Sequence, residues 1–133
     1  MTGRGAGLPL AEPRQLAHEI LVRVERGAHA DALVGTALQK QKLEPRDAGL
    51  FTRLVYGCLT WQGRLDWTLA ALSSRPLEKL DPEVRAALRL GLFQLFLLDR
   101  IPAHAAIDTS VRLATAVRGS KVGGYVNAIL RNA

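Results

Sequence analysis

The sequence contains a single cysteine, Cys58, among its 133 residues. One thiol cannot form an internal disulfide, and it leaves no cysteine cluster for a zinc site. Cys58 lies on an apolar helical stripe, where we expect a buried thiol. Because scarce cysteine is typical of proteins in reducing compartments, we expect a cytoplasmic location.

Aromatic residues and long hydrophobic runs are also scarce. Aromatic side chains make up 5% of the chain, so we expect a core of Leu, Ala and Val. No apolar run reaches the roughly 20 residues of a membrane span, and we predict no membrane association. The Gly-rich start is too weakly apolar for a signal peptide, so we interpret residues 1–12 as a flexible tail.

Catalytic and cofactor-binding patterns are missing as well. The histidines, His18, His29 and His104, are scattered and lack a carboxylate partner at a suggestive spacing. The stretch G-S-K-V-G-G (residues 119–124) lacks the preceding strand and the spacing of a nucleotide-binding loop. We therefore predict no cofactor, no metal site and no enzymatic activity for the chain as it stands.

The most informative stretch that is present runs from Asp81 to Leu98. Asp81 can cap a helix whose first position is Pro82, and apolar residues then follow on nearly every side. A helix of this kind must be buried on most of its surface. We predict the central helix of a helical domain, with Arg85 and Arg89 marking the one face that reaches solvent.

Shorter amphipathic segments surround this stretch. The spacing of apolar residues predicts helices from Pro13 to Gly27, from Asp31 to about Lys42, from Pro45 towards Trp61, and then over residues 64–72, 103–117 and 122–130. Gly57 and Gly63 predict a bend or break near Trp61, and we expect Trp61 and Trp67 to lie in the core or in a seam. The loop at residues 73–76 is the best boundary between two helical subdomains, over about 13–73 and 77–133.

Three motifs carry a family resemblance. The runs A-A-L-R-L-G-L-F-Q-L (residues 86–95), I-P-A-H-A-A-I-D-T-S-V-R-L-A (101–114) and Y-V-N-A-I-L-R-N (125–132) resemble the NusB-like family. That family comprises the transcription antitermination factor NusB and the N-terminal RNA-binding domain of the RsmB/Sun/Fmu ribosomal RNA 5-methylcytosine methyltransferases. The resemblance covers residues 13–132 and implies an all-α fold of about seven helices in two packed subdomains.

Details within these motifs favour the methyltransferase branch. They are Phe93-Gln94-Leu95, the turn beginning at Ile101-Pro102, and the run that starts at Asn127. Only Arg14 matches the arginine-rich segment that leads into the first helix of NusB. The resemblance thus implies a non-catalytic RNA-binding domain of a methyltransferase that positions small-subunit ribosomal RNA. The alternatives are a NusB-type antitermination factor and a protein-interaction or dimerisation module.

The charge distribution agrees with an RNA partner. The formal net charge is +6, and four basic residues and no acidic ones follow Asp108. The resemblance implies an RNA surface joining the start of the first helix to the start of the last. Tyr125 is either a stacking platform for an unpaired base or a core residue. The predicted RNA-binding residues are Arg14, His18, Arg118, Lys121, Tyr125 and Arg131. Other candidate partners are a C-terminal methyltransferase domain, a ribosomal protein and a second copy of the chain.

Overall fold

The computed structural model describes residues 12–133, so the predicted tail over residues 1–12 lies outside the described residues except for Glu12. The described residues form seven α-helices and one short 3₁₀-helix, η1. Their bounds are α1 (Pro13–Glu25), α2 (Ala30–Lys40), α3 (Pro45–Thr60), α4 (Gln62–Leu72), η1 (Leu77–Lys79), α5 (Pro82–Leu97), α6 (Ala103–Arg118) and α7 (Ser120–Arg131). The predicted all-α fold class is confirmed.

The helix ends follow from a few residues. Proline occupies the first turn of α1, α3 and α5, where the N–H that it lacks would have no intrahelical partner. The carboxylate of Glu12 caps α1 by accepting hydrogen bonds from the backbone N–H groups of Arg14 and Gln15, at 3.2 and 2.9 Å. Asp81 precedes α5 as predicted, but its side chain makes no capping bond and instead forms an ion pair with Arg118.

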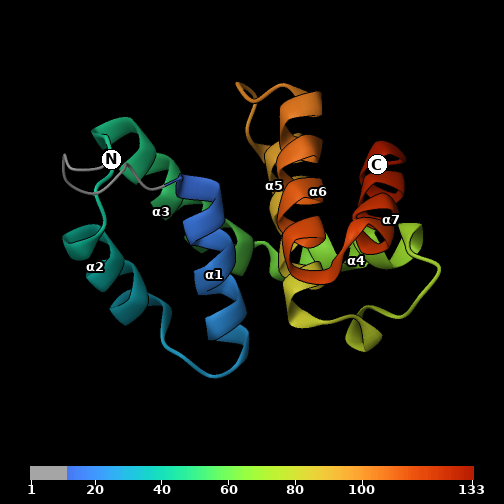
Figure 1. Ribbon diagram of the computed structural model, residues 1–133, viewed down its shortest axis with the longest axis horizontal. Coiled ribbons are helices and arrows are strands. Elements are labelled where there is room, and N and C mark those ends of the chain that lie inside the picture. The colour runs from blue at the N-terminus through green and yellow to red at the C-terminus, as the bar shows by residue number, and fades with distance from the viewer. Residues whose placement is uncertain (1–11) are drawn as a thin grey trace.

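Helix α5 is the centre of the fold, as predicted. It packs against α1, α3, α4, α6 and α7 (Figure 1). Its side chains include Leu88, Leu90 and Leu92, all with 0% of their surface exposed. Since burying one leucine contributes about 1.5–3 kcal/mol, this helix supplies a large share of the core. Phe96, in its last turn, is the exception and is 51% exposed.

Two glycines let neighbouring helices approach α5 closely. A methyl group added at Gly91 would lie 2.5 Å from Cδ1 of Leu130 and 2.7 Å from Oγ of Ser110. A methyl group at Gly57, in α3, would lie 2.1 Å from Cζ of Phe93. The break predicted near Trp61 is confirmed, because α3 ends at Thr60 and α4 begins at Gln62. Gly57 itself lies within α3, where its lack of a side chain serves packing.

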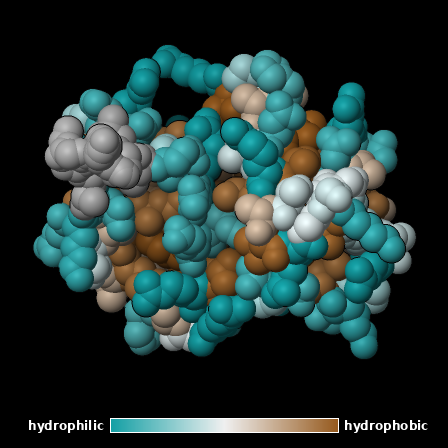
Figure 2. All heavy atoms as spheres, in the orientation of Figure 1, coloured by the Kyte–Doolittle hydropathy of each residue, from teal (hydrophilic) through white to brown (hydrophobic). Residues whose placement is uncertain are grey.

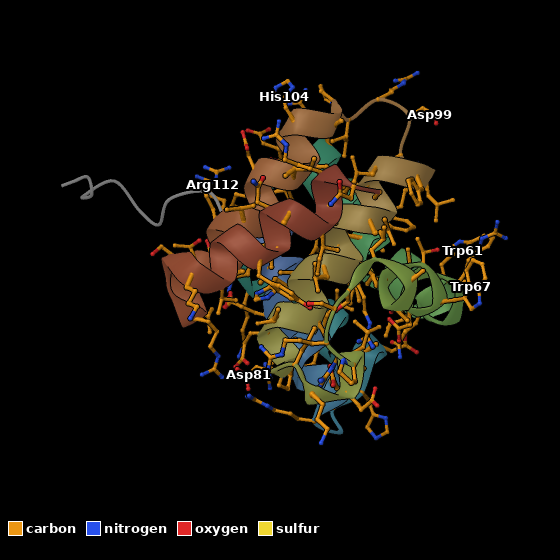
Figure 3. All side chains as sticks on the ribbon, turned by 90° about the vertical axis from the view of Figure 1, so that its right-hand side faces the viewer. Trp61, Trp67, Asp81, Asp99, His104 and Arg112 are labelled. Carbon is orange, nitrogen blue, oxygen red and sulfur yellow. The ribbon has the colours of Figure 1, made fainter. Side chains whose placement is uncertain are left out.

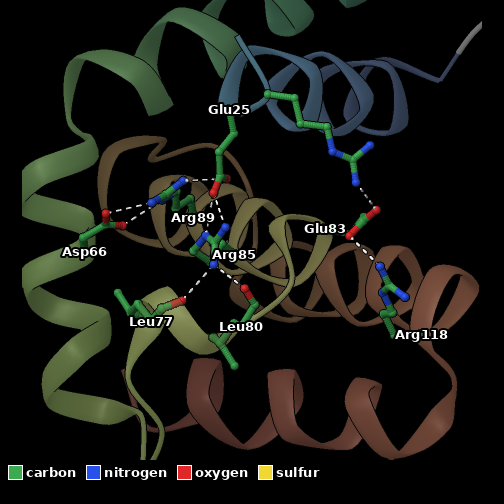
Figure 4. Close-up of polar contacts among 9 residues, drawn as sticks. Glu25, Asp66, Leu77, Leu80, Glu83, Arg85, Arg89 and Arg118 are labelled. Carbon is green, nitrogen blue, oxygen red and sulfur yellow. Dashed lines mark hydrogen bonds and ion pairs between the residues drawn. The ribbon is translucent and has the colours of Figure 1, made fainter.

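The predicted roles of Arg85 and Arg89 are wrong. Both side chains are only 13% exposed because α1 and α4 cover that face of α5 and supply carboxylates to it (Figure 4). Arg89 donates to both carboxylate oxygens of Asp66, at 2.7 and 2.8 Å. Arg85 donates from Nε to Glu25 at 2.8 Å and also binds the carbonyl groups of Leu77 and Leu80. This seam of α5 is polar, and ion pairs fill it.

The two tryptophans, which the sequence predicts in the core or in a seam, are instead exposed to solvent. Trp61 is 42% exposed and Trp67 is 77% exposed. Figure 3 shows both side chains pointing away from the helices on the same side of the molecule. The core does not need them, because Leu65 and Leu69 fill the inner face of α4. Cys58, by contrast, is buried as expected, and burial raises the pKa of its thiol to about 12, although the charge of Arg89 acts in the opposite direction.

The helices fall into two groups around this core. Helices α1, α2 and α3 lie to one side in Figure 1, and α5, α6 and α7 to the other. The division into subdomains stays a prediction, since buried residues from both groups form one continuous core. Hydrophilic side chains cover much of the visible face, with hydrophobic areas between α1 and α2 (Figure 2). None of the described helices is long and apolar enough to span a membrane.

Candidate RNA-binding surface

The corner between α6 and α7 holds two of the predicted RNA-binding residues. Gly119 adopts φ +93°, a conformation that side chains with a Cβ rarely adopt, and α7 starts immediately after it. Arg118 therefore ends α6 and Lys121 lies in the first turn of α7. Lys121 is exposed, and within the described residues it has no ion-pair partner.

Arg118 is already engaged within the protein. Its Nε lies 3.2 Å from Oδ2 of Asp81, and a second guanidinium nitrogen lies 3.0 Å from Oε1 of Glu83. The hydrogen bond to Glu83, together with the charges of Asp81 and Glu83, raises the pKa of Arg118 above its ordinary value. Its charge is thus largely neutralised by neighbouring carboxylates.

Glu83 joins α1, α5 and α6 at this point (Figure 4). Its other carboxylate oxygen accepts a hydrogen bond from Arg26 at 3.1 Å. Burial raises the pKa of Glu83, but the bond from its own backbone amide and the bonds and charges of Arg118 and Arg26 outweigh burial, so the net pKa is lowered. Glu83 is therefore an acceptor that stays ionised at neutral pH.

His18 lies in the same junction and is buried, with 4% of its surface exposed. Its Nε2 lies 2.8 Å from the carbonyl oxygen of Glu83, which fixes that nitrogen as the donor. This environment gives His18 a role in joining α1 to α5. It leaves almost no surface on the imidazole for contact with RNA.

Tyr125 is half-buried and packs against the core. Its hydroxyl forms a hydrogen bond with the hydroxyl of Ser73, which connects α7 to the end of α4. The ring also lines a small hollow with Leu72 and Ile129. These contacts favour the core alternative for Tyr125 over the stacking one.

Arg14 and Arg131 lie far from one another along the fold. Arg14 is in the first turn of α1, where its Nε donates to Oε1 of Gln94 at 2.8 Å. Arg131 ends α7 and is exposed. Figure 1 shows α6 between α1 and α7, so the start of α1 does not lie beside the start of α7. The predicted edge shared by both helix starts is not formed.

Arginines that the prediction omitted surround Arg14. A groove of about 880 Å³ is lined by Arg14, Arg46, Arg53 and Arg100, and we call it the arginine groove. It lies between α3 and the turn that follows α5. The sequence carries a signal for part of it, because Arg46 and Arg53 are seven residues apart and therefore share a face of α3. The contribution of Arg100 depends on tertiary packing.

A metal centre is not among these features. The residues that the structure describes contain no group of three or more His, Cys, Asp or Glu side chains that could hold a metal ion. The exposed ammonium and guanidinium groups at this surface can bind anions through charge-assisted hydrogen bonds.

Comparisons with known proteins give the family. The sequence pattern of the NusB family matches residues 11–133. Relatives include ribosomal RNA small subunit methyltransferase B from Pseudomonas syringae, 40% identical over 121 residues that cover 91% of this chain and 27% of that protein. The enzyme of the same name from Thermus thermophilus is 42% identical over 119 residues, which cover 90% of this chain and 29% of that protein.

Solved structures show the same fold. A chain in the crystal structure of antitermination factors NusB and NusE in complex with dsRNA superposes with a TM-score of 0.81 at 22% identity, covering 91% of this chain and 92% of that chain. The chain described here spans about a quarter of the length of the curated methyltransferases that it matches. With a family pattern that covers nearly all of it and a shared helical fold, the chain belongs to the NusB family.

Proposed function

We propose that this chain is a non-catalytic RNA-binding domain of a ribosomal RNA (cytosine-5) methyltransferase, and that it positions small-subunit ribosomal RNA. The observation that carries the proposal is the alignment, at about 40% identity over 91% of the chain, with a ribosomal RNA small subunit methyltransferase. Exposed cations after Asp108, with no acidic residue following, supply the attraction to phosphate. The site of action is the cytoplasm.

The contribution of the domain is electrostatic and positional. Lysine and arginine side chains displace condensed counterions from the RNA backbone, which gives a binding free energy that depends steeply on salt. Contacts of this kind fix orientation and register, and they carry little sequence information. A catalytic domain joined to this one would receive its substrate already placed.

The six predicted residues divide into two roles in this proposal. Lys121, Arg131 and Arg14 have exposed or half-exposed charges and contact phosphate. His18, Arg118 and Tyr125 hold α1, α6 and α7 in position through the contacts described above. These three residues therefore act indirectly, by fixing the helices that carry the phosphate-binding side chains.

The test is binding to a structured fragment of small-subunit ribosomal RNA, measured by filter retention at several salt concentrations. Affinity should fall steeply as salt rises, and the double variant Lys121→Glu, Arg14→Glu should weaken binding further. The control is Lys40→Glu, Lys42→Glu, which reverses two exposed charges at the end of α2. If the Lys121 and Arg14 variant binds like its control, the proposed contacts of these two residues with phosphate are wrong.

One observation favours a second function, that of a protein-interaction module. Trp67 is 77% exposed on α4, and large exposed aromatic side chains are typical of protein interfaces. Its candidate partners are a methyltransferase domain, a ribosomal protein and a second copy of the chain. Sedimentation of the purified chain, alone and with RNA, separates the two functions: a tight dimer with no RNA affinity would favour the second.

A further inference from the structure

The arginine groove contains positive charge that the protein itself does not neutralise. Its lining has four arginines and two aspartates, Asp47 and Asp99. Arg46, Arg53 and Arg100 are exposed, and among residues 12–133 none of them has a carboxylate within ion-pair distance. Residues 1–11 contain no Asp or Glu, so that segment cannot supply a carboxylate side chain either. Positive charge kept unpaired at one place favours an anionic ligand.

The floor of the groove is apolar. Leu50 of α3, Leu97 at the end of α5 and Ile101 in the turn after α5 line it, and all three are half-buried. Charged walls over an apolar floor suit a ligand that alternates phosphate with less polar sugar and base surfaces, as a nucleic acid strand does. An acidic peptide would pair with the arginines of the walls, but its carboxylates would make no favourable contact with the apolar floor.

A second hollow continues from the groove along α3. Arg53 and Leu97 line both, and the second hollow, of about 390 Å³, is also lined by Tyr56, Trp61 and Phe93. The Tyr56 hydroxyl is bonded to Asp31, and Phe93 is buried. Trp61, 42% exposed, is therefore the aromatic face that is available.

Helical geometry sets these groups in order. Arg46, Arg53 and Trp61 are seven and eight residues apart, which gives spacings of about 10 and 12 Å along the axis of α3. Figure 3 shows Asp99, in the turn beside the groove, and Trp61 along one edge of the molecule. The series is therefore cation, cation and aromatic ring on one continuous path.

We propose that single-stranded RNA binds along α3, with its phosphates on Arg46, Arg53 and Arg100 and one base stacked on Trp61. This inference rests on the proposed RNA-binding function and locates a binding path for it on a face separate from the α6–α7 corner. Stacking on a tryptophan tolerates any base, so the path holds RNA without selecting its sequence.

The first test measures binding of fluorescein-labelled oligouridine by anisotropy. Arg46→Gln with Arg53→Gln should lower the slope of log affinity against log salt by about 1.4, since each phosphate contact on a single strand contributes about 0.7. Trp61→Ala should weaken binding about tenfold, and Trp61→Phe should restore most of it. The control is Arg23→Gln with Lys40→Gln, which removes two exposed charges outside the groove.

The second test uses fluorescence. The sequence has two tryptophans, so Trp67→Phe leaves Trp61 as the only one and Trp61→Phe leaves Trp67. Unlabelled oligouridine should quench the first variant and leave the second unchanged, an effect that a purely structural role for Trp61 would not produce.

The outcomes are distinguishable. If the unmodified chain binds neither oligouridine nor the ribosomal fragment, the proposed function itself fails. If it binds RNA but the groove and Trp61 variants behave like the control, only the path along α3 is overturned. Equal binding and quenching by oligoglutamate would also overturn it, because an acidic peptide would then satisfy the site.

Discussion

Two groups of arginines in this molecule have the same chemistry and opposite surroundings. Arg85, Arg89 and Arg118, which we call the paired group, each lie within ion-pair distance of a carboxylate. Arg46, Arg53 and Arg100 of the arginine groove have no such partner among residues 12–133. The amino-acid composition does not distinguish these six arginines. The comparison shows that the fold decides which positive charges hold helices together and which remain available to a ligand.

The largest expected effect comes from removing Glu25, the acceptor that Arg85 and Arg89 of the paired group share. Glu25→Ala leaves two guanidinium groups with 13% exposed side chains without one of their carboxylates. Because an uncompensated, mostly buried charge is costly, the free energy of unfolding should fall by about 2 kcal/mol. Urea denaturation measures this, and alkylation of Cys58 should accelerate in parallel.

The matched control is Glu19→Ala, on the exposed side of the same helix. It should change the free energy of unfolding by less than about 0.5 kcal/mol. Equal effects of the two substitutions would mean that the ion pairs of Glu25 with Arg85 and Arg89 do not stabilise the fold.

A smaller loss should follow from Arg118→Gln. This side chain is 39% exposed, so solvent screens its ion pairs more than those of Arg89. We expect a loss in the free energy of unfolding that is smaller than the loss from Glu25→Ala. Thermal unfolding in low and high salt checks this, and the loss should shrink as salt rises. A salt-independent loss would indicate packing as the cause.

The junction at Glu83 should also make stability depend on pH. Its pKa in the folded protein lies below its ordinary value of 4.5, so the stability that it contributes is present above about pH 4.5 and is lost as pH falls through the folded pKa. The difference in stability between the unmodified chain and Glu83→Gln should therefore narrow on acidification. A constant difference from neutral pH to acid would contradict the ion pairs.

The smallest effect on stability should come from the arginine groove. Arg46→Gln with Arg53→Gln removes no ion pair among residues 12–133, so the free energy of unfolding should change by no more than about 0.5 kcal/mol. Urea denaturation beside the Glu25 variant makes the comparison direct. A loss as large as that of Glu25→Ala would place these arginines among the structural ones.

Much of the fold could be predicted because helix boundaries are local. Pro13, Pro45 and Pro82 mark helix starts, and the apolar spacing of residues 82–98 predicts the buried centre. The errors concern polar side chains. Arg85 meets Glu25, which is 60 residues away, and periodicity along one helix cannot show which polar faces meet.

The same limit explains which residues of the candidate site could be predicted from the sequence and which could not. Lys121 and Arg131 could be predicted as exposed because they lie in the first and last turns of a clearly amphipathic helix. His18 could not, because its burial depends on a carbonyl of α5. The prediction that Trp61 and Trp67 lie in the core or in a seam fails because the smaller Leu65 and Leu69 fill the inner face of α4.

The position of α5 has a consequence for synthesis on the ribosome. Helix α1 leaves the exit tunnel first, yet one of its packing partners spans residues 82–97. Until that partner emerges, the apolar stripe of α1 has only α2 and α3 to cover it, and Glu25 has neither arginine. The packing of α1 is therefore complete only after more than two-thirds of the domain has been translated.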